Sequence, residues 1–294
     1  MTAPLKLGAV VITMGTRPDE LRALLDSVAK QDGDRIEVVV VGNGASVVDV
    51  PDGVHTVDLP ENLGIPGGRN VGIEAFGPGG RDVDVLLFLD DDGLLPHTDT
   101  AQLVREAFDA DPGLGIISFR IADPETGLTQ RRHVPRLRAA DPMRSSRVTT
   151  FLGGANAVRT KVLGQVGGLP DEFFYAHEET DLAWRALDAG WSIDYRADMV
   201  LFHPTMPPSR HAVYHRMVAR NRVWVARRNL PVPLVPVYVG VWLLITLLRR
   251  PSLPALKAWF GGFMEGWRTS CGPRRPMKWR TVWRLTRLGR PPVI

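Results

Sequence analysis

The sequence has little cysteine and no visible export signal. Cys271 is the only cysteine in 294 residues, which excludes an internal disulfide and the usual thiolate metal sites. The N-terminal stretch MTAPLKLGAVVITMG lacks a charged leader, a long apolar stretch and a cleavage site. We therefore expect a protein that stays in a reducing cytoplasm.

Acidic residues are nearly absent from the last part of the chain. From Thr205 onward there are 17 Lys and Arg against one acid, Glu265, giving +16, whereas the preceding 204 residues hold 19 basic and 31 acidic residues, giving −12. This division predicts two domains, residues 1–204 and a basic region at 205–294. Tryptophan is spread through that region, as Trp224, Trp242, Trp259, Trp267, Trp279 and Trp283. Tryptophan and arginine beside apolar surface are typical of a membrane interface.

The basic region lacks a run that is clearly long enough to span a bilayer. The apolar stretch at 232–248, VPLVPVYVGVWLLITLL, sits at the lower edge of the ~17–25 residues that a crossing needs, and Pro233 and Pro236 would disturb its first turns. We expect a helical region that lies on the cytoplasmic face of the membrane. A buried helix that caps the globular domain and an oligomer interface are the alternatives. Nucleic-acid binding is disfavoured because the basic residues are mixed with apolar runs.

Strand-length apolar segments alternate with helical ones in the first 204 residues. We predict helices from about Asp19 to Ala29 and from near Asn70, and strands at Leu7–Thr13, Ile36–Val41, His55–Leu59, Val83–Leu89 and Met199–Phe202. Strands that are apolar throughout indicate an α/β fold, with a Rossmann-like, mostly parallel sheet and helices on both faces. The ligand site of such a sheet lies beyond the carboxyl ends of its strands.

The dinucleotide fingerprint G-x-G-x-x-G is missing, since TMGTRPDE follows the first strand, and this disfavours a dehydrogenase. A different anion site is indicated by ENLGIPGGRN. Its glycines permit close backbone approach, and free N–H groups at the following helix start favour an anion. Arg69 adds forked donors that suit a diphosphate, and Arg17 in the first turn could lie against a phosphate.

Three acids end the strand in VLLFLDDDGLLP, although adjacent carboxylates repel one another. An Asp-x-Asp pair that faces a diphosphate can hold Mg²⁺ or Mn²⁺ between protein and phosphate oxygens. Asp92 would be a direct ligand, and Asp90 would meet the nucleotide's ribose or a metal-bound water. His203, at the end of the last predicted strand, could complete the metal shell through a neutral imidazole. A hydrated acidic turn is the alternative interpretation.

Two further acids, Glu178 and Glu179, begin an amphipathic helix in EETDLAWRALDAGW. Negative charge at a helix start is favourable in itself. A carboxylate at this place could also accept a proton from an acceptor hydroxyl as that hydroxyl attacks a sugar's anomeric carbon.

The order of these motifs resembles that of the inverting glycosyltransferases of the GT-A fold in family 2, the group that includes bacterial rhamnosyltransferases and galactofuranosyltransferases. The resemblance covers roughly residues 7–205. It rests on VVIT, ENLGIPGGRNVG, DDD, FLGGANAVR, EETDLAWRALDAGW and the histidine at a strand end.

The resemblance implies roles for individual residues. The donor-binding set would be Thr13, Arg17, Asn43, Asn62, Gly67, Arg69, Asp90 and Asp91, and the metal ligands would be Asp90, Asp92 and His203. Gly153, Gly154 and Ala155 would border the donor sugar and the acceptor. Glu179 would be the base, with Glu178 and Asp181 as the other candidates. Relatives commonly carry Asp where this chain has Asn43, so dTDP-, UDP- and GDP-sugars all remain open.

These observations predict a metal-dependent, inverting transfer of a sugar from a nucleotide-sugar donor to a hydroxyl of a glycan or polyprenyl-linked acceptor. We expect it to serve cell-envelope glycan synthesis, peripherally on the inner face of the cell membrane, with a homo-oligomer left open. A sugar nucleotidyltransferase is one alternative, although it should open with a glycine-rich phosphate loop. A non-catalytic scaffold that binds nucleotide sugars is the other.

Overall fold

A mixed β-sheet forms the centre of the protein. The computed structural model describes residues 3–137, 141–204, 212–249 and 251–294. The sheet has the strand order β3-β2-β1-β4-β7-β5-β8-β6. Its strands are β1 (Leu7–Thr13), β2 (Glu37–Gly42), β3 (His55–Asp58), β4 (Val85–Asp90), β5 (Leu114–Ala122), β6 (Ser146–Arg147), β7 (Ala155–Arg159) and β8 (Ser192–Phe202).

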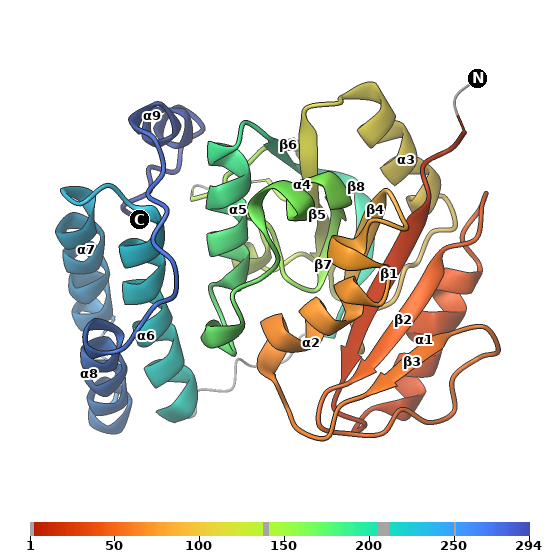
Figure 1. Cartoon of the computed structure of the whole chain (residues 1–294), viewed down its shortest axis with the longest axis horizontal. Helices are drawn as coiled ribbons and strands as arrows, with labels where there is room; N and C mark the ends of the chain where they lie inside the picture. The colour runs from red at the N-terminus through yellow and green to blue at the C-terminus, as the bar shows by residue number, and fades with distance from the viewer. Residues whose placement is uncertain (1–2, 138–140, 205–211, 250) are drawn as a thin grey trace.

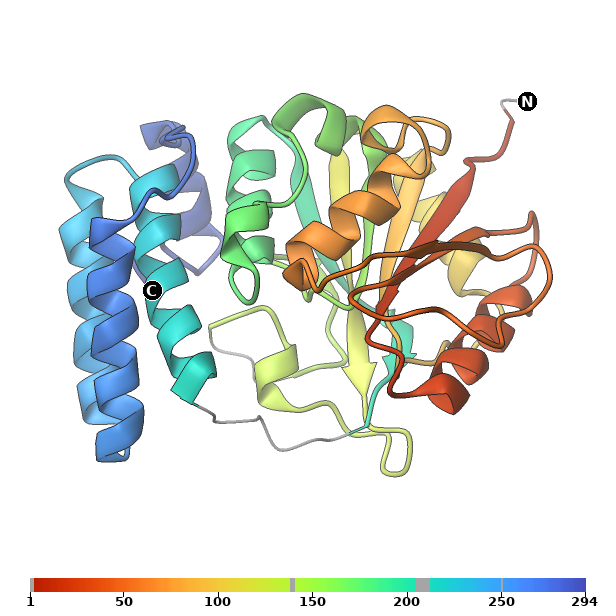
Figure 2. The same cartoon turned by 60° about the horizontal axis from the view of Figure 1, so that its bottom comes forward.

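The predicted parallel arrangement is confirmed for the first four strands. β3, β2, β1 and β4 are parallel neighbours, so their carboxyl ends share one edge of the sheet, which is turned forward in Figure 2. β7 then lies antiparallel to both β4 and β5, and β6 lies antiparallel to β8. The last predicted strand is the end of the longer β8, whose pairing with β5 shifts register between Phe119 and Arg120. The sheet is therefore mixed, with its parallel half at the predicted site.

Helices cover both faces of the sheet, as predicted (Figure 1). On one face lie α1 (Pro18–Ala29) and α3 (Thr100–Ala110), and on the other lie α2 (Gly64–Glu74), α4 (Thr160–Val166) and α5 (Glu178–Asp188). Short 3-10 turns lie at η1 (Pro78–Gly80), η2 (Arg131–His133) and η3 (Asp171–Phe173). The leucine pattern of α1 explains its position, because Leu21, Leu24, Leu25 and Val28 form one buried stripe.

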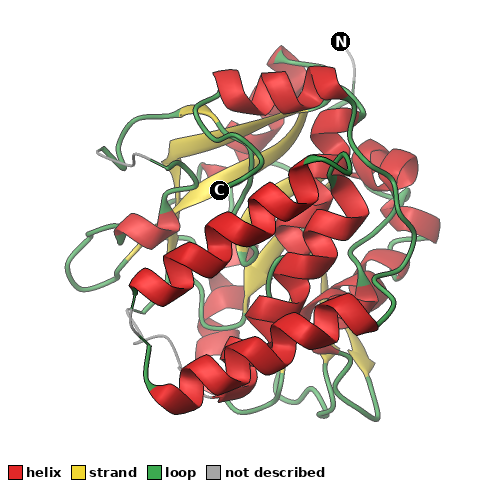
Figure 3. Cartoon of the chain, turned by 90° about the vertical axis from the view of Figure 1, so that its left-hand side faces the viewer, coloured by secondary structure: helices red, strands yellow, loops and turns green. Residues whose placement is uncertain are grey.

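Long helices of the basic region pack beside α5. They are α6 (Ala212–Asn229), α7 (Leu234–Leu248) and α8 (Leu253–Arg268), followed by the shorter α9 (Trp279–Arg287). Figure 3 shows them from their outer side. One apolar core continues from the sheet through α5 to Trp224, Leu230 and Tyr238. The division at residue 204 stays a prediction, and residues 205–211 lie outside the described part of the chain.

The apolar run at 232–248 is mostly α7, and its two halves differ. Val235, Tyr238 and Val239 are buried in the core, whereas Leu244, Leu247 and Leu248 near the other end are exposed. None of the helices in the described ranges combines the length and apolar character that crossing a bilayer requires. The predicted helical character of the region is confirmed, and its contact with a membrane stays a prediction.

A buried carboxylate ties α5 to α6. Asp181 is fully buried, with one oxygen accepting hydrogen bonds from Arg228 Nε at 2.9 Å and Asn229 Nδ2 at 2.7 Å and the other accepting from Arg185 Nε at 2.8 Å. Removing one partner from a buried ion pair typically costs about 3–5 kcal/mol, because a charge is left uncompensated. The helices of the basic region are thus joined to the sheet by charge as well as by apolar packing.

Candidate functional site

A pocket of about 530 Å³ opens where β1, β2 and β4 end. Most of the predicted donor and metal residues line it, brought together from four strand ends and one loop. They are Thr13, Arg17, Asn43, Asn62, Asp90, Asp91, Asp92 and His203. The parallel register of β1 with its two neighbours explains the convergence, since Thr13 is aligned with Gly42 and Ile12 with Asp90.

The three acids at the end of β4 have three different partners. Asp91 accepts a hydrogen bond from Thr13 Oγ1 at 2.7 Å, yet burial raises its pKa in spite of that bond. Asp92 forms ion pairs with Arg17 and with His203, whose Nε2 lies 3.1 Å from Asp92 Oδ1. Burial alone would raise the pKa of Asp92, but His203 and Arg17 lower it. Asp90 turns away toward Arg69.

The predicted metal set is only partly assembled. In the described ranges no three His, Cys, Asp or Glu side chains form a group that could hold a metal ion. Asp92 and His203 do lie together. The Nδ1 of His203 contacts the Pro204 carbonyl at 2.9 Å, and its Nε2 faces Asp92. Two protein ligands fit a cation whose other ligands are water and substrate phosphate oxygens, as is common for Mg²⁺. Asp90 is not part of this pair.

The glycine-rich segment differs from its prediction. α2 begins at Gly64, not near Asn70, and its first amides are already bonded within the protein. Leu63 N donates to Asn43 Oδ1, Gly64 N to Asn62 Oδ1 and Ile65 N to the Phe174 carbonyl, each at 2.8 Å. The expectation of free amides for an anion is therefore wrong. Asn43 and Asn62 instead shape the pocket wall by holding this turn.

Two other residues of the segment lie inside α2, behind the pocket. A Cβ on Gly67 would lie 2.7 Å from Leu63 Cβ, so Gly67 permits the first turn of the helix to pack. Arg69 is buried, with Nη2 at 3.2 Å from Asp90 Oδ1 and Nη1 at 4.0 Å from Glu178 Oε1. Its guanidinium also lies 5.8 Å from the centre of the Phe88 ring. Arg69 is thus the buried cation between two carboxylates.

Gly153 and Gly154, the predicted glycine pair, lie between Asp90 at the end of β4 and Glu179 of α5. A Cβ on Gly154 would lie 1.8 Å from Asp90 Oδ2, and one on Gly153 would lie 2.7 Å from Glu179 Oε1 and 3.1 Å from Arg69 Nη1. Ala155 follows as the first residue of β7, buried opposite Leu89 of β4. Any larger residue at 153 or 154 would displace a carboxylate, so these glycines let Asp90 and Glu179 lie on opposite sides of one short segment.

Glu179 faces a second pocket, of about 570 Å³. Gly153 and the side chains around it form one wall, and five arginines line the remainder: Arg131, Arg132, Arg136, Arg249 and Arg290. Sequence reasoning missed these arginines, since they come from three distant segments. The signal that could have found the first of them is the local density of arginine in RRHVPRLR.

Burial perturbs both glutamates at the start of α5. Desolvation, followed by repulsion from Glu179, raises the pKa of Glu178 to about 8, and one of its oxygens has no hydrogen-bond partner. Burial also raises the pKa of Glu179. A raised pKa brings a carboxylate closer to the value at which it accepts and releases protons near neutral pH. Glu179 has access to a pocket, whereas Glu178 is enclosed beside Arg69.

The third candidate base is excluded by its contacts. Asp181 has both carboxylate oxygens occupied by donors of α5 and α6, and its side chain is fully buried. It cannot receive a proton from a substrate hydroxyl, so its assignment as a possible base is wrong. Its function is to hold two helices together.

A strained loop leads into α5 and reaches the first pocket. Phe174, Ala176 and His177 have positive φ angles of 60°, 70° and 71°, a conformation that costs energy in non-glycine residues. Asn221 of α6 holds the loop, because its Nδ2 donates to the carbonyls of Phe173, Tyr175 and Ala176. Phe174 and Tyr175 line the pocket beside His203. These two residues were also missed, since a single sequence gives no sign of backbone strain.

Comparison with known proteins assigns the chain to a protein family. A protein-family model described as "Glycosyl transferase family 2" matches residues 9–167. No curated protein matches the sequence. The match covers more than half of the chain and includes most of β1, the Asp90–Asp92 acids and the glycine pair.

Several solved structures share the fold at low sequence identity. S. aureus TarS 1–349 is 17% identical, with a TM-score of 0.61 over 89% of this chain and 81% of that one. The mannosyltransferase PcManGT from Pyrobaculum calidifontis, solved with GDP-Man and Mn²⁺, is 18% identical, with a TM-score of 0.55 over 98% and 85%. GalNAc-T7, solved with UDP, GalNAc and Mn²⁺, is 13% identical, with a TM-score of 0.62 over 81% and 50%. Against a longer TarS chain the match spans only 39% of that protein.

The buried Glu178 predicts an unusual dependence of stability on pH. Its folded-state pKa of about 8 lies above its unfolded value, so between these values the folded state binds a proton that the unfolded state has lost. The free energy of unfolding therefore falls as pH rises through this window. Glu178→Gln should gain at least about 1 kcal/mol relative to the native protein between pH 5 and pH 8, measured by urea unfolding. Exposed Glu125→Gln should show no such gain, and an equal gain in both variants would contradict the assignment.

Proposed function

The chain belongs to glycosyl transferase family 2, and we propose that it transfers a sugar, with inversion, from a dTDP-, UDP- or GDP-sugar to a hydroxyl of a glycan or polyprenyl-linked acceptor in cell-envelope glycan synthesis. One observation carries the proposal. The Gly153–Gly154 segment separates Asp90, in the pocket at the strand ends, from Glu179, in the second pocket. A donor in the first pocket and an acceptor in the second would meet at this segment.

The chemical step follows from that placement. Glu179 accepts the proton of the acceptor hydroxyl while the hydroxyl oxygen forms a bond to the anomeric carbon. The bond from that carbon to the diphosphate oxygen breaks, and the nucleoside diphosphate leaves with the bonding electron pair. Because the acceptor approaches from the side of Glu179 and the leaving group departs on the opposite side, the configuration at the carbon inverts.

Charged groups at the first pocket suit a diphosphate. Arg17 is half-exposed and lines the pocket, and Arg69 lies buried behind Asp90. Asp92 and His203 would hold Mn²⁺ or Mg²⁺ together with phosphate oxygens, and such a cation neutralises negative charge on a leaving diphosphate. The relatives solved with UDP, with GDP-Man and with Mn²⁺ are consistent with this assignment.

Replacing the proposed base tests the transfer step directly. Glu179→Gln should lower turnover by about 10²- to 10⁴-fold, the usual contribution of a general base, while donor affinity stays unchanged. The measurement is release of nucleoside diphosphate in the presence of acceptor, with donor affinity by calorimetry. Full turnover in Glu179→Gln together with loss in Glu178→Gln would assign the base to the neighbouring residue.

Metal dependence is tested by thermal stabilisation. UDP, dTDP, GDP and CDP are each added with and without Mn²⁺ to the native protein and to Asp92→Ala. A ligand that binds only the folded state raises the melting temperature, so one nucleotide should give a shift that requires both Mn²⁺ and Asp92. Asp19→Ala, at the exposed start of α1, is the control. An equal Mn²⁺-dependent shift in Asp92→Ala would remove that residue from the cation site.

We further propose that the basic region seats the enzyme on the inner face of the cell membrane. Large apolar side chains are exposed along α7, α8 and α9, among arginines and lysines: Val237, Leu244, Leu247, Leu248, Leu253, Phe260, Met264, Trp267, Trp279 and Trp283. Such surface is typical of proteins that lie in the headgroup region. A homo-oligomer is the competing use of the same side chains.

Paired acidic substitutions separate these uses. Leu244 is 57% exposed and Leu253 is 81% exposed, so Leu244→Glu with Leu253→Glu should preserve the fold and abolish sedimentation with vesicles rich in anionic lipid. The matched control is Val48→Glu with Leu128→Glu, two comparably exposed residues of the sheet domain. Unchanged sedimentation, or a dimer in solution that the first pair disrupts, would contradict peripheral membrane binding.

A further inference from the structure

The second pocket has a strong excess of positive charge. Five arginines line it, and Glu179 is the only acid among its lining residues in the described part of the chain. They come from the segment 131–136, from the end of α7 and from the turn after α9. Cations gathered in a concave site raise the local concentration of anions, so the lining of this pocket favours an anionic ligand over a neutral one.

Two of these arginines have no ion-pair partner among the residues that the structure describes. Arg249 and Arg290 form no ion pair with any acid in the described ranges. Arg136 differs, since it donates to Ser146 Oγ and to the Asp141 carbonyl. Burial lowers the pKa of Arg290, which means that the protein holds a desolvated cation at some cost. Arg249 and Arg290 are therefore available to a ligand.

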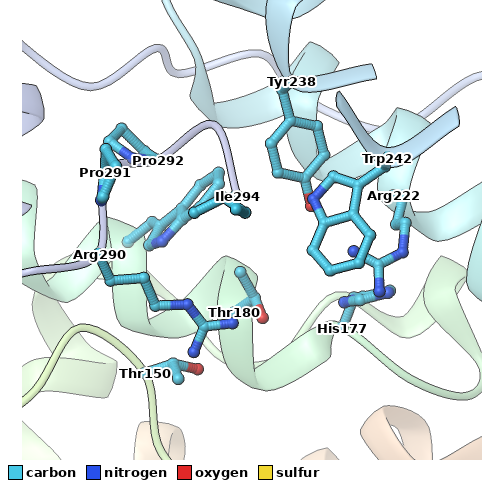
Figure 4. Close-up of a pocket in the computed structure, with 11 residues that line it drawn as sticks. Thr150, His177, Thr180, Arg222, Tyr238, Trp242, Arg290, Pro291, Pro292 and Ile294 are labelled. Carbon is cyan, nitrogen blue, oxygen red and sulfur yellow. The ribbon is translucent and has the colours of Figure 1, made fainter. Parts of the chain in front are cut away.

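A small adjoining cavity of about 110 Å³ has the same character. Arg290 lies at its edge, with its guanidinium near Thr150 and Thr180, which line both cavities (Figure 4). His177 Nε2 and Trp242 Nε1 are buried beside the cavity without a hydrogen-bond partner. Unpaired buried polar groups are rare in folded proteins. These two lie beside Arg222, across this cavity from Arg290, and indicate that a polar ligand or water completes the cavity.

Apolar surface begins where the arginines end. Arg249 directly follows the last turn of α7, whose Leu247 and Leu248 are exposed, and Leu253 begins α8 on the other side of the turn. A ligand with its charge on Arg249 and Arg290 would therefore have hydrocarbon surface on one side and Glu179 on the other. This order matches a lipid-linked substrate, with its chain, its phosphate and its sugar in sequence.

We propose that the arginine pocket is the acceptor subsite for the phosphate or diphosphate of a lipid-linked acceptor. Arg249 and Arg290 bind the anion, the lipid chain leaves along the exposed ends of α7 and α8, and the sugar hydroxyl reaches Glu179. The inference rests on the proposed transferase function, because it takes Glu179 as the base. It narrows the two proposed acceptor classes to a lipid-linked phosphate or diphosphate and names the residues that select it.

The test measures binding without turnover. Farnesyl diphosphate serves as a short lipid-diphosphate probe, inorganic diphosphate as the anion alone, and both are titrated by calorimetry into the full chain. Arg249→Gln with Arg290→Gln should weaken farnesyl diphosphate binding by about tenfold or more, the effect of losing one or two charge-assisted hydrogen bonds. Arg280→Gln, an exposed arginine of α9 outside both cavities, is the matched control. If the double variant does not fold, the single variant Arg249→Gln replaces it, since Arg249 is exposed. It should weaken farnesyl diphosphate binding by a smaller factor.

The outcomes separate this inference from the transferase proposal. Equal affinity in native protein and arginine variants would overturn the subsite, as would inorganic diphosphate that binds as tightly as farnesyl diphosphate. Competition of farnesyl diphosphate with a nucleoside diphosphate would also overturn it, since one shared pocket would then bind both. The transferase proposal fails by different observations, namely no release of nucleoside diphosphate by the native protein and no thermal stabilisation by any of the four nucleotides. These observations do not depend on Arg249 or Arg290.

Discussion

The buried guanidinium of Arg69 is the interaction on which the arrangement of both pockets depends. Asp90 and Glu178 are brought close by elements far apart in sequence, and Arg69 lies between them. Burial and repulsion from Glu179 raise the pKa of Glu178, and the guanidinium of Arg69 opposes that rise. Arg69 comes from α2, the helix whose first turn is fixed by Asn43 and Asn62. The hydrogen bonds that hold the first turn of α2 therefore also help to place Arg69 between Asp90 and Glu178.

The basic region is part of the structure that positions the site. Asn221 holds three carbonyls of the strained loop, and Asp181 receives donors from α6, so the loop and the start of α5 are fixed from the side of the C-terminal helices. The opposite charges of the two parts meet in the ion pair of Asp181 with Arg228. Apolar packing joins the two parts as well, because one core continues from the sheet through α5 to the C-terminal helices.

Much of the site could be predicted because it follows local rules. An apolar strand that ends in acids fixes where Asp90 to Asp92 lie, and a parallel sheet fixes their common edge with Thr13 and Asn43. The start of α2 could not be predicted, because its glycines are typical of a loop and two of the groups that hold its first turn, Asn43 and the Phe174 carbonyl, are distant in sequence. The structural use of Asp181 depends on Arg228 and Asn229, 47 and 48 residues away. No local pattern identifies such partners, and the same applies to the arginines of the second pocket.

The contact of Asn221 with the loop has a mechanical consequence. The two hydrogens of Asn221 Nδ2 are shared among the carbonyls of Phe173, Tyr175 and Ala176, which attaches this loop to α6. Tyr175 lines the pocket at the strand ends, and α6 packs against both α7 and α8. The wall of the pocket at the strand ends is therefore attached, through one side chain, to the helices of the basic region.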